Sequence, residues 1–121
     1  MKFILLFLVL LSPGLAQSQT GQELLDRCSH YVAGKSGEEL EPAQMIKATS
    51  CFSYIDGFGA ADSLSPLEHE GKRMFCVPEQ VSIKEAATSI IEWMQANPEK
   101  LGYPARHVVA MALISTFPCK T

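Results

Sequence analysis

The sequence predicts a small all-α domain, a bundle of about four helices arranged as two antiparallel hairpins and closed by two disulfides. Apolar residues recur at helical spacing in four segments, and no alternating stretch of strand length appears. Two capping boxes mark helix starts. Four cysteines in a chain of 121 residues that begins with an export signal favour disulfides over metal or redox chemistry.

The first segment of the chain, residues 1–16, has the pattern of a secretory signal peptide. Lys2 supplies a positive charge, an unbroken apolar run covers residues 3–11, and residues 14–16 (Gly-Leu-Ala) provide the small side chains of a cleavage site. The apolar run is too short to span a bilayer. We therefore expect export and cleavage to leave residues 17–121 as one helical domain, with no stable membrane insertion.

The charge composition argues against a nucleic-acid partner. The formal net charge is −3, and removal of Lys2 with the signal peptide makes it −4. Nucleic-acid binding needs a concentrated positive surface. The charges of this chain are instead scattered, which is typical of a solvated protein surface.

The first predicted hairpin begins with a capping box, in which Thr20 is the N-cap residue and Glu23 the N3 residue. Gly34 and Gly37 are expected to end this helix. Its apolar face is expected to contain Leu24, Leu25, Cys28, Tyr31 and Val32.

The second helix is expected to begin at Pro42, whose missing N–H does no harm in a first turn, and to end near Leu64. Gly57 and Gly59 would each cost about 1 kcal/mol relative to alanine inside a helix. We therefore expect another backbone to approach closely at these glycines. The apolar stripe of this helix is expected to contain Met45, Ala48, Phe52, Ile55 and Gly59, with Cys51 at its edge.

A polar segment from Ser65 to Arg73, broken by Pro66 and Gly71, predicts the longest exposed loop. Loops held by a rigid scaffold often carry function. Because Cys76 would anchor the far end of this loop, the loop would lose less entropy on binding than a free one. The predicted partner-binding residues are Ser65, Glu68, His69, Glu70, Lys72 and Arg73.

The third helix is the cleanest amphipathic segment of the chain. A second capping box, Ser82 with Glu85, opens it, and Asn97-Pro98 closes it. Trp93 lies at the border of the apolar face, where it belongs either to the core or to an exposed contact surface. The face itself is expected to contain Ile83, Ala86, Ala87, Ile90, Ile91 and Met94, and the preceding Met74, Phe75 and Val77 are expected to return the chain to the core.

The fourth helix is expected to run from about Ala105 to Phe117, after a short connector. Pro104 suits its first turn, and Pro118 stops it. Its buried stripe is expected to contain Ala105, Val108, Val109, Ala112, Leu113 and Thr116.

Helix geometry selects among the three pairings that four cysteines allow. A short connector makes the third and fourth helices antiparallel neighbours of similar length. Cys76, which precedes the third helix, would then lie beside Cys119, which follows the fourth. Cys28 and Cys51 lie on two helices joined by one loop and are expected to pair in the same way. The other pairings would link a mid-helix position to a chain end, which is less direct.

No pattern in the sequence points to catalysis, a cofactor or a metal. Gly-x-Ser-x-Gly, His-Glu-x-x-His and Cys-x-x-Cys do not occur. His30, His69 and His107 lie far apart, without the spacing of metal ligands. We therefore expect a protein that acts by binding, not an enzyme.

An ordered set of short elements links this chain to a known family. The elements are, in order, Cys51-x-x-Tyr54-Ile55-x-Gly57, Phe75-Cys76-x-Pro78, Asn97-Pro98-Glu99, Ala110-x-Ala112-Leu113 and Phe117-Pro118-Cys119. From about Cys28 to Cys119, and after a signal peptide, this set resembles the Rap/Tai family of type VI secretion amidase immunity proteins. The resemblance implies a periplasmic, helical, disulfide-bonded protein, often a homodimer, that binds a peptidoglycan amidase effector and occludes its active-site cleft.

These shared residues are mostly structural, so two other functions stay open. One is a periplasmic helical binding module with no amidase partner. The other is an acid-stress chaperone, which would expose apolar surface as its carboxylates become protonated. With 19% charged residues, the chain is not unusually rich in such groups. For a homodimer, the sequence itself offers only Trp93 at an apolar border.

Overall fold

The computed structural model describes residues 19–68 and 73–120, so the predicted signal peptide lies outside the described residues. Within these ranges the chain is helical and forms no strand, apart from an isolated bridge between Thr20 and Pro104. The all-α prediction is confirmed. The elements are α2 (Gly21–Lys35), α3 (Pro42–Glu68), α4 (Ile83–Ala96), the 3-10 turn η1 (Pro98–Lys100) and α5 (Ala105–Thr116).

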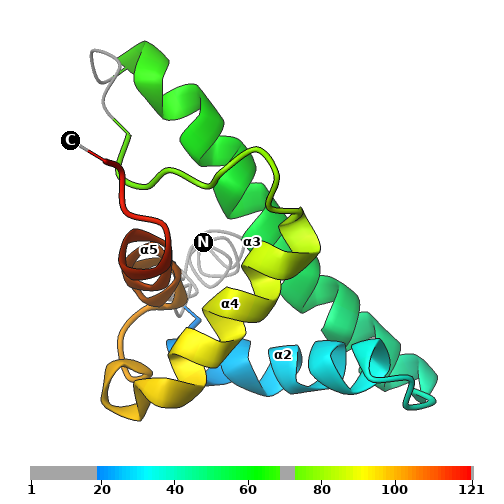
Figure 1. The fold of residues 1–121 in the computed structure, drawn as a ribbon. Coiled ribbons are helices and arrows are strands. Elements are labelled where there is room, and N and C mark those ends of the chain that lie inside the picture. Colours follow the sequence, from blue (N-terminus) through cyan, green and yellow to red (C-terminus); the bar gives the residue numbers. More distant parts are fainter. Residues whose placement is uncertain (1–18, 69–72, 121) are drawn as a thin grey trace, which may run out of the picture.

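The helices form a small bundle with a triangular outline (Figure 1). α2 and α3 run in opposite directions along two sides of the triangle and splay apart from the loop that joins them. α4 lies across the view of Figure 1, whereas α5 is seen along its axis. The two helices therefore cross steeply and do not form the antiparallel pair that the short connector predicted. The connector contains η1 and redirects the chain before α5 begins.

Local hydrogen bonds fix the helix ends where the sequence places them. Both capping boxes are formed: the backbone N–H of Glu23 donates to the Thr20 hydroxyl at 3.2 Å, and that of Glu85 donates to the Ser82 hydroxyl at 3.2 Å. At the end of α2, Gly37 has a φ of 87°, a conformation that suits glycine. The predicted starts of α2 and α4 and the stop at Gly37 are confirmed, whereas Gly34 lies inside α2.

The start of α2 is bound to the connector between α4 and α5. The backbone N–H of Gly21 donates to the Tyr103 carbonyl at 2.9 Å. A Cβ added at Gly21 would lie 2.6 Å from the Val108 side chain. At Gly57 and Gly59 an added Cβ would meet nothing within 4 Å. The prediction that another backbone approaches Gly57 and Gly59 closely is therefore wrong. The close approach occurs at Gly21 instead.

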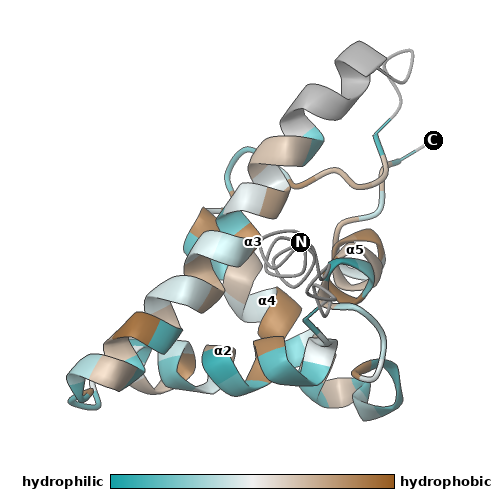
Figure 2. Ribbon diagram, turned by 180° about the vertical axis from the view of Figure 1, so that it is seen from behind, coloured by the Kyte–Doolittle hydropathy of each residue, from teal (hydrophilic) through white to brown (hydrophobic). Residues whose placement is uncertain are grey.

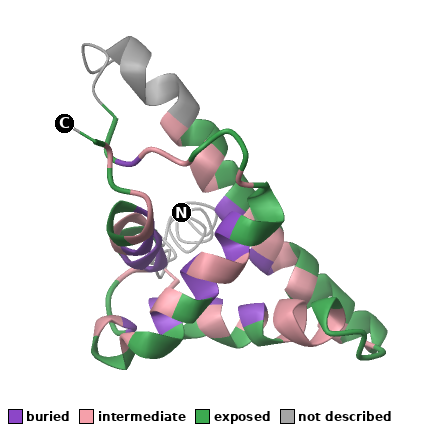
Figure 3. Ribbon diagram, viewed as in Figure 1, coloured by how far each residue is buried: buried purple, intermediate pink, exposed green. Residues whose placement is uncertain are grey.

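The core lies where α4 and α5 meet α2 and the middle of α3 (Figure 3). Hydrophilic residues cover most of the visible side of α2 in Figure 2, whereas strongly hydrophobic residues mark α4 and α5. Trp93 is partly buried and packs against the core, so it belongs to the core rim. The buried apolar residues are Leu24, Cys28, Cys51, Ile55, Phe75, Ala86, Ala87, Ile90, Ile91, Met94, Leu101, Ala105, Val108, Val109, Ala112 and Leu113.

Three residues predicted to be apolar core members are exposed. Met45 is in the first turn of α3, at a corner of the molecule where only the end of α2 lies nearby (Figure 1). Met74 precedes Phe75 in a non-helical segment, and Phe75 takes the inward position. Ile83 opens α4 and is exposed at the edge of its apolar face.

α3 continues to Glu68, so the prediction that it ends near Leu64 was wrong. Pro66 lies within its last turn. A proline there removes one backbone hydrogen bond, to the carbonyl four residues earlier, and little helix follows in which further bonds could be lost. Residues 65–68 of the predicted loop are therefore helical.

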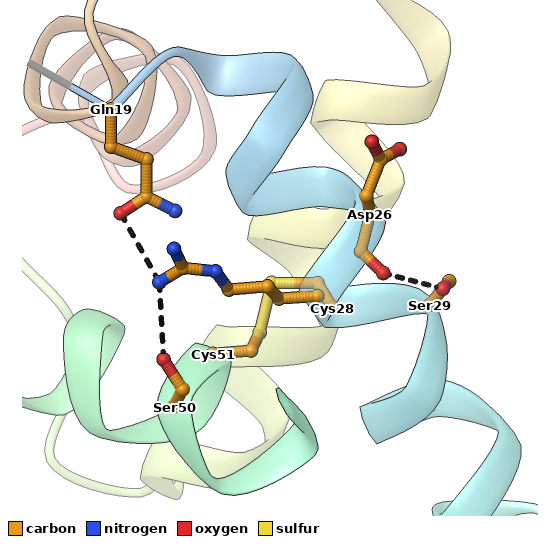
Figure 4. Close-up of a disulfide and its surroundings, with 7 residues drawn as sticks. Gln19, Asp26, Cys28, Ser29, Ser50 and Cys51 are labelled. Carbon is orange, nitrogen blue, oxygen red and sulfur yellow. Dashed lines mark hydrogen bonds between the residues drawn. A yellow bond between two sulfur atoms is a disulfide. The ribbon is translucent and has the colours of Figure 1, made fainter. Parts of the chain in front are cut away.

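Both predicted disulfides are present. Cys28 and Cys51 have a Cα–Cα distance of 5.1 Å, and Cys76 and Cys119 one of 4.8 Å. Both distances lie within the usual range for disulfides. Figure 4 shows the first bridge between α2 and α3.

Candidate functional site

A non-helical segment, residues 73–81, crosses between α3 and α5 and is called the strap below. Its disulfide, Cys76–Cys119, ties it to the chain beyond α5, and the backbone N–H of Cys76 donates to the Phe117 carbonyl at 2.8 Å. Phe75 is only 2% exposed and stacks on Phe58 of α3, with ring centroids 6.4 Å apart. The strap is therefore fixed to α3 and to the chain that follows α5.

A pocket of about 230 Å³ lies between the strap and the helices. Ile55, Gly59 and Asp62 share one face of α3 because they are four and three residues apart. Gly59 gives the pocket part of its room, since no atom lies within 4 Å of the position that a Cβ would take. The lining residues are Ile55, Gly59, Asp62, Arg73, Phe75, Val77, Val81, Ile83, Ala86, Ile90 and Leu113.

The polar groups of this pocket are few. The Oδ1 atom of Asp62 is buried and accepts no hydrogen bond. Arg73 lines the same pocket but is exposed. A buried polar atom without a partner costs free energy, and more so when it carries charge. The site thus combines apolar walls with one unsatisfied acceptor, an arrangement suited to binding.

Comparison with known protein families identifies the chain. The model of the Rap1a immunity proteins matches residues 20–119. The chain belongs to the Rap1a immunity protein family. The match begins at the N-cap of α2 and ends at the last cysteine, so it covers all four described helices and both disulfides. No curated protein and no solved structure matches the chain.

Membership of the Rap1a family confirms the resemblance drawn from the sequence and supports an immunity role, in which the protein binds an effector protein. It also suggests an inhibitor without catalytic activity of its own. The strap pocket is the part of the described surface where a fixed backbone, apolar walls and an unsatisfied charged group coincide.

The structure places three of the six predicted partner-binding residues. Ser65 and Glu68 lie in the last turns of α3, and Arg73 lies at the start of the strap, beside the pocket. The other three, His69, Glu70 and Lys72, lie outside the described residues. That these six residues bind a partner stays a prediction.

Sequence reasoning missed Asp62. The signal was present, because Asp62 continues the stripe formed by Ile55 and Gly59. An acidic residue on an apolar stripe is a candidate for a buried polar group. The helix was expected to end close by, where a carboxylate would be solvated, and the packing of the strap against this face could not be foreseen.

A second polar group lies at the seam of α2 and α3, near the Cys28–Cys51 bridge (Figure 4). Arg27 Nη1 donates to Gln19 Oε1 at 3.5 Å and to Ser50 Oγ at 3.3 Å. Both acceptors are neutral. These contacts link the two helices across the bridge, and they give Arg27 a structural role.

The described residues contain no cluster of three or more metal-ligating side chains. None of the helices in residues 19–68 and 73–120 is long and apolar enough to cross a membrane. Burial raises the pKa of Tyr54, an effect that the charge of Arg106 opposes. Burial also raises the pKa of Tyr31. Neither phenol lines the strap pocket, so neither contributes to this candidate site.

Proposed function

We propose that this Rap1a family protein acts in the periplasm, where it binds a peptidoglycan amidase effector of a type VI secretion system and occludes its active-site cleft. The observation that carries the proposal is the family match over residues 20–119, together with the Rap/Tai elements quoted above. The immunity role follows from the family, and the amidase and the compartment are our extension of it.

Two features support the periplasmic location. Residues 1–16 have the pattern of a signal peptide, and all four cysteines are paired in disulfides, which persist in oxidising compartments. We expect the mature chain to begin at Gln17. Cell fractionation with N-terminal sequencing tests this, and a cytoplasmic chain that retains residues 1–16 would contradict it.

The strap end of the molecule is the surface we propose for effector binding. The strap is held by a disulfide, a buried aromatic side chain and a backbone hydrogen bond. A surface fixed in this way loses little conformational entropy when a partner binds. The predicted binding residues Ser65, Glu68 and Arg73 lie at this end.

Partner capture tests the function. The tagged, oxidised mature protein is mixed with extracts of the source cells, and a captured amidase is then purified and assayed on peptidoglycan. We expect near-complete inhibition at an equimolar ratio. The control is the same protein after reduction and alkylation of its cysteines, which should inhibit less. An amidase that stays fully active in excess protein, or capture of unrelated proteins alone, would count against the proposal.

We also propose that the protein forms a homodimer, as the resemblance implies. Trp93 offers little support for this, because it is partly buried against the core of its own chain. Exposed apolar side chains lie instead at the start of α3, where Ile46 is 71% exposed and Met45 is 51% exposed. Light scattering of the mature protein at micromolar concentration should give twice the mass of one chain, and the mass of a single chain would refute the dimer.

A further inference from the structure

We infer that the strap pocket binds a basic side chain, a lysine or an arginine, that the effector presents. The inference rests on the proposed function for the identity of the partner, and on the pocket itself for the chemistry. It assigns to Asp62 the role of pairing with the incoming cation.

The size of the pocket favours a side chain over a free small molecule. Its volume of about 230 Å³ is below the range of roughly 300–1,000 Å³ that small-molecule sites usually have. Ile55, Phe75, Val77, Ile90 and Leu113 give it apolar walls. Such walls suit the alkyl stem of a long basic side chain, which buries its methylene groups and carries its charge at the tip.

The unpaired oxygen of Asp62 favours a cation in this pocket. Asp62 Oδ1 is buried without a hydrogen-bond donor, although Arg73 lines the same pocket. An apolar side chain entering the pocket would leave this oxygen unsatisfied, and an acidic one would repel it. An ammonium or guanidinium group would donate a charge-assisted hydrogen bond, which is stronger than a neutral one. Truncation of one partner of such a buried pair usually costs a large part of the affinity.

Gly59 makes a direct test feasible. An added Cβ at Gly59 or at Gly57 meets nothing within 4 Å, so a leucine can be introduced at either position of α3. Gly59 lines the pocket, whereas Gly57 does not. Gly59→Leu should therefore fill the pocket, and Gly57→Leu is its matched control on the same helix. Asp62→Asn removes the charge and keeps the size of the side chain.

The first experiment uses side-chain analogues and needs no effector. The oxidised mature protein is titrated with n-butylammonium and n-butylguanidinium while backbone amide shifts are followed by NMR, with n-butanol and butyrate as neutral and anionic controls. We expect saturable shifts of pocket residues with a Kd on the order of millimolar for the cations, since each probe has few atoms. Asp62→Asn should weaken this binding at least tenfold, Gly59→Leu should abolish it, and Gly57→Leu should leave it unchanged.

Equal binding of n-butanol and n-butylammonium, an Asp62→Asn variant that binds as the wild type does, or equal effects of the two leucine variants would overturn the inference. So would the absence of any saturable shift. Circular dichroism of each variant shows whether it has folded, so that a lost site is not confused with a lost fold.

The second experiment separates this inference from the proposed function. The affinity of a captured amidase is measured for the wild type and for Asp62→Asn, and we expect a loss of at least tenfold. If the amidase binds both proteins equally, the pocket inference fails while the immunity function stands. If no amidase binds but the pocket takes n-butylammonium, the amidase assignment fails while the cation-binding chemistry stands.

Discussion

The two disulfides of this protein have sequence separations of 23 and 43 residues and lie in different surroundings. Cys28–Cys51 joins two helices inside the core, where both residues are 0% exposed (Figure 4). Cys76–Cys119 joins two non-helical segments and is only partly buried. The loop-entropy model assigns about 3.5 kcal/mol to the first bridge and about 4 kcal/mol to the second. The comparison teaches that loop length does not reveal which bridge holds the core and which holds a binding surface.

Removal of the core bridge should have the largest effect. We expect Cys28→Ala with Cys51→Ala to lower the free energy of unfolding by about 5 kcal/mol, the upper end of the usual range, because both residues lie in the core and their truncation also leaves a cavity. Urea denaturation of the variant and the wild type measures this. A loss below about 2 kcal/mol would show that the bridge adds little to the packing of α2 on α3.

Removal of the strap bridge should lower stability less than removal of the core bridge, and it should lower effector affinity. We expect Cys76→Ala with Cys119→Ala to lower the free energy of unfolding by about 2–3 kcal/mol, less than the loop-entropy value, because the released strap regains entropy in the folded protein. Hydrogen exchange of residues 73–81 should accelerate, and effector affinity should fall. Unchanged effector binding in a folded variant would separate the strap from the binding site.

Alanine substitutions at two glycines should change the stability of the protein in opposite directions. Gly21→Ala should destabilise the protein by about 1–3 kcal/mol, because its Cβ would lie 2.6 Å from the Val108 side chain in a packed region. Gly57→Ala should stabilise it by up to about 1 kcal/mol, because its Cβ has open space and alanine is the better helix former. Thermal unfolding of the pair measures both, and equal shifts in Tm would contradict the assignment of the close approach.

Loss of the capping box between the strap and α4 should have the smallest effect on stability. Ser82→Ala should cost about 1 kcal/mol. The backbone N–H and hydroxyl of Ser82 both donate to Glu85, and they lower the pKa of its carboxyl below the ordinary 4.5. The charged form therefore stabilises the folded state above the unfolded pKa, and this contribution is lost as the pH falls through the folded pKa.

Glu85→Gln should remove this part of the pH dependence. The measurement is urea denaturation of the wild type and Glu85→Gln at pH 7 and pH 3. The stability difference between the two proteins should be larger at pH 7 than at pH 3. A difference that stays the same at both pH values would show that the Glu85 carboxylate does not act through its charge.

Much of the fold could be predicted because its signals are local. Thr20 with Glu23 and Ser82 with Glu85 mark helix starts through hydrogen bonds within a single turn. Both cysteine pairings were predicted correctly, although α4 and α5 are not the antiparallel pair from which the second was argued. It is the strap that brings Cys76 to the end of α5. The crossing of α4 and α5 could not be predicted, since it depends on how the connector packs against the start of α2 at Gly21.

The candidate site was less predictable for the same reason. Ser65 was predicted to open a loop but lies in α3, and the pocket beside Arg73 is formed by segments distant in the sequence. Phe75 of the strap and Leu113 of α5 meet Ile55 of α3 there, and the strap bridge ties the strap to the chain that follows α5. The burial of Asp62 Oδ1 is a consequence of that packing, and its only signal in the sequence was the position of Asp62 on the stripe of Ile55 and Gly59.

The central claim is that the effector binds at the strap end of the molecule. Hydrogen–deuterium exchange of the oxidised protein, with and without a captured amidase, tests it most directly. We expect new protection in residues 73–81 and along the α3 segment 55–62, with little change in the loop at 36–41, at the opposite end of α3. Protection confined to that loop and the adjoining end of α2, with the strap unchanged, would contradict the claim.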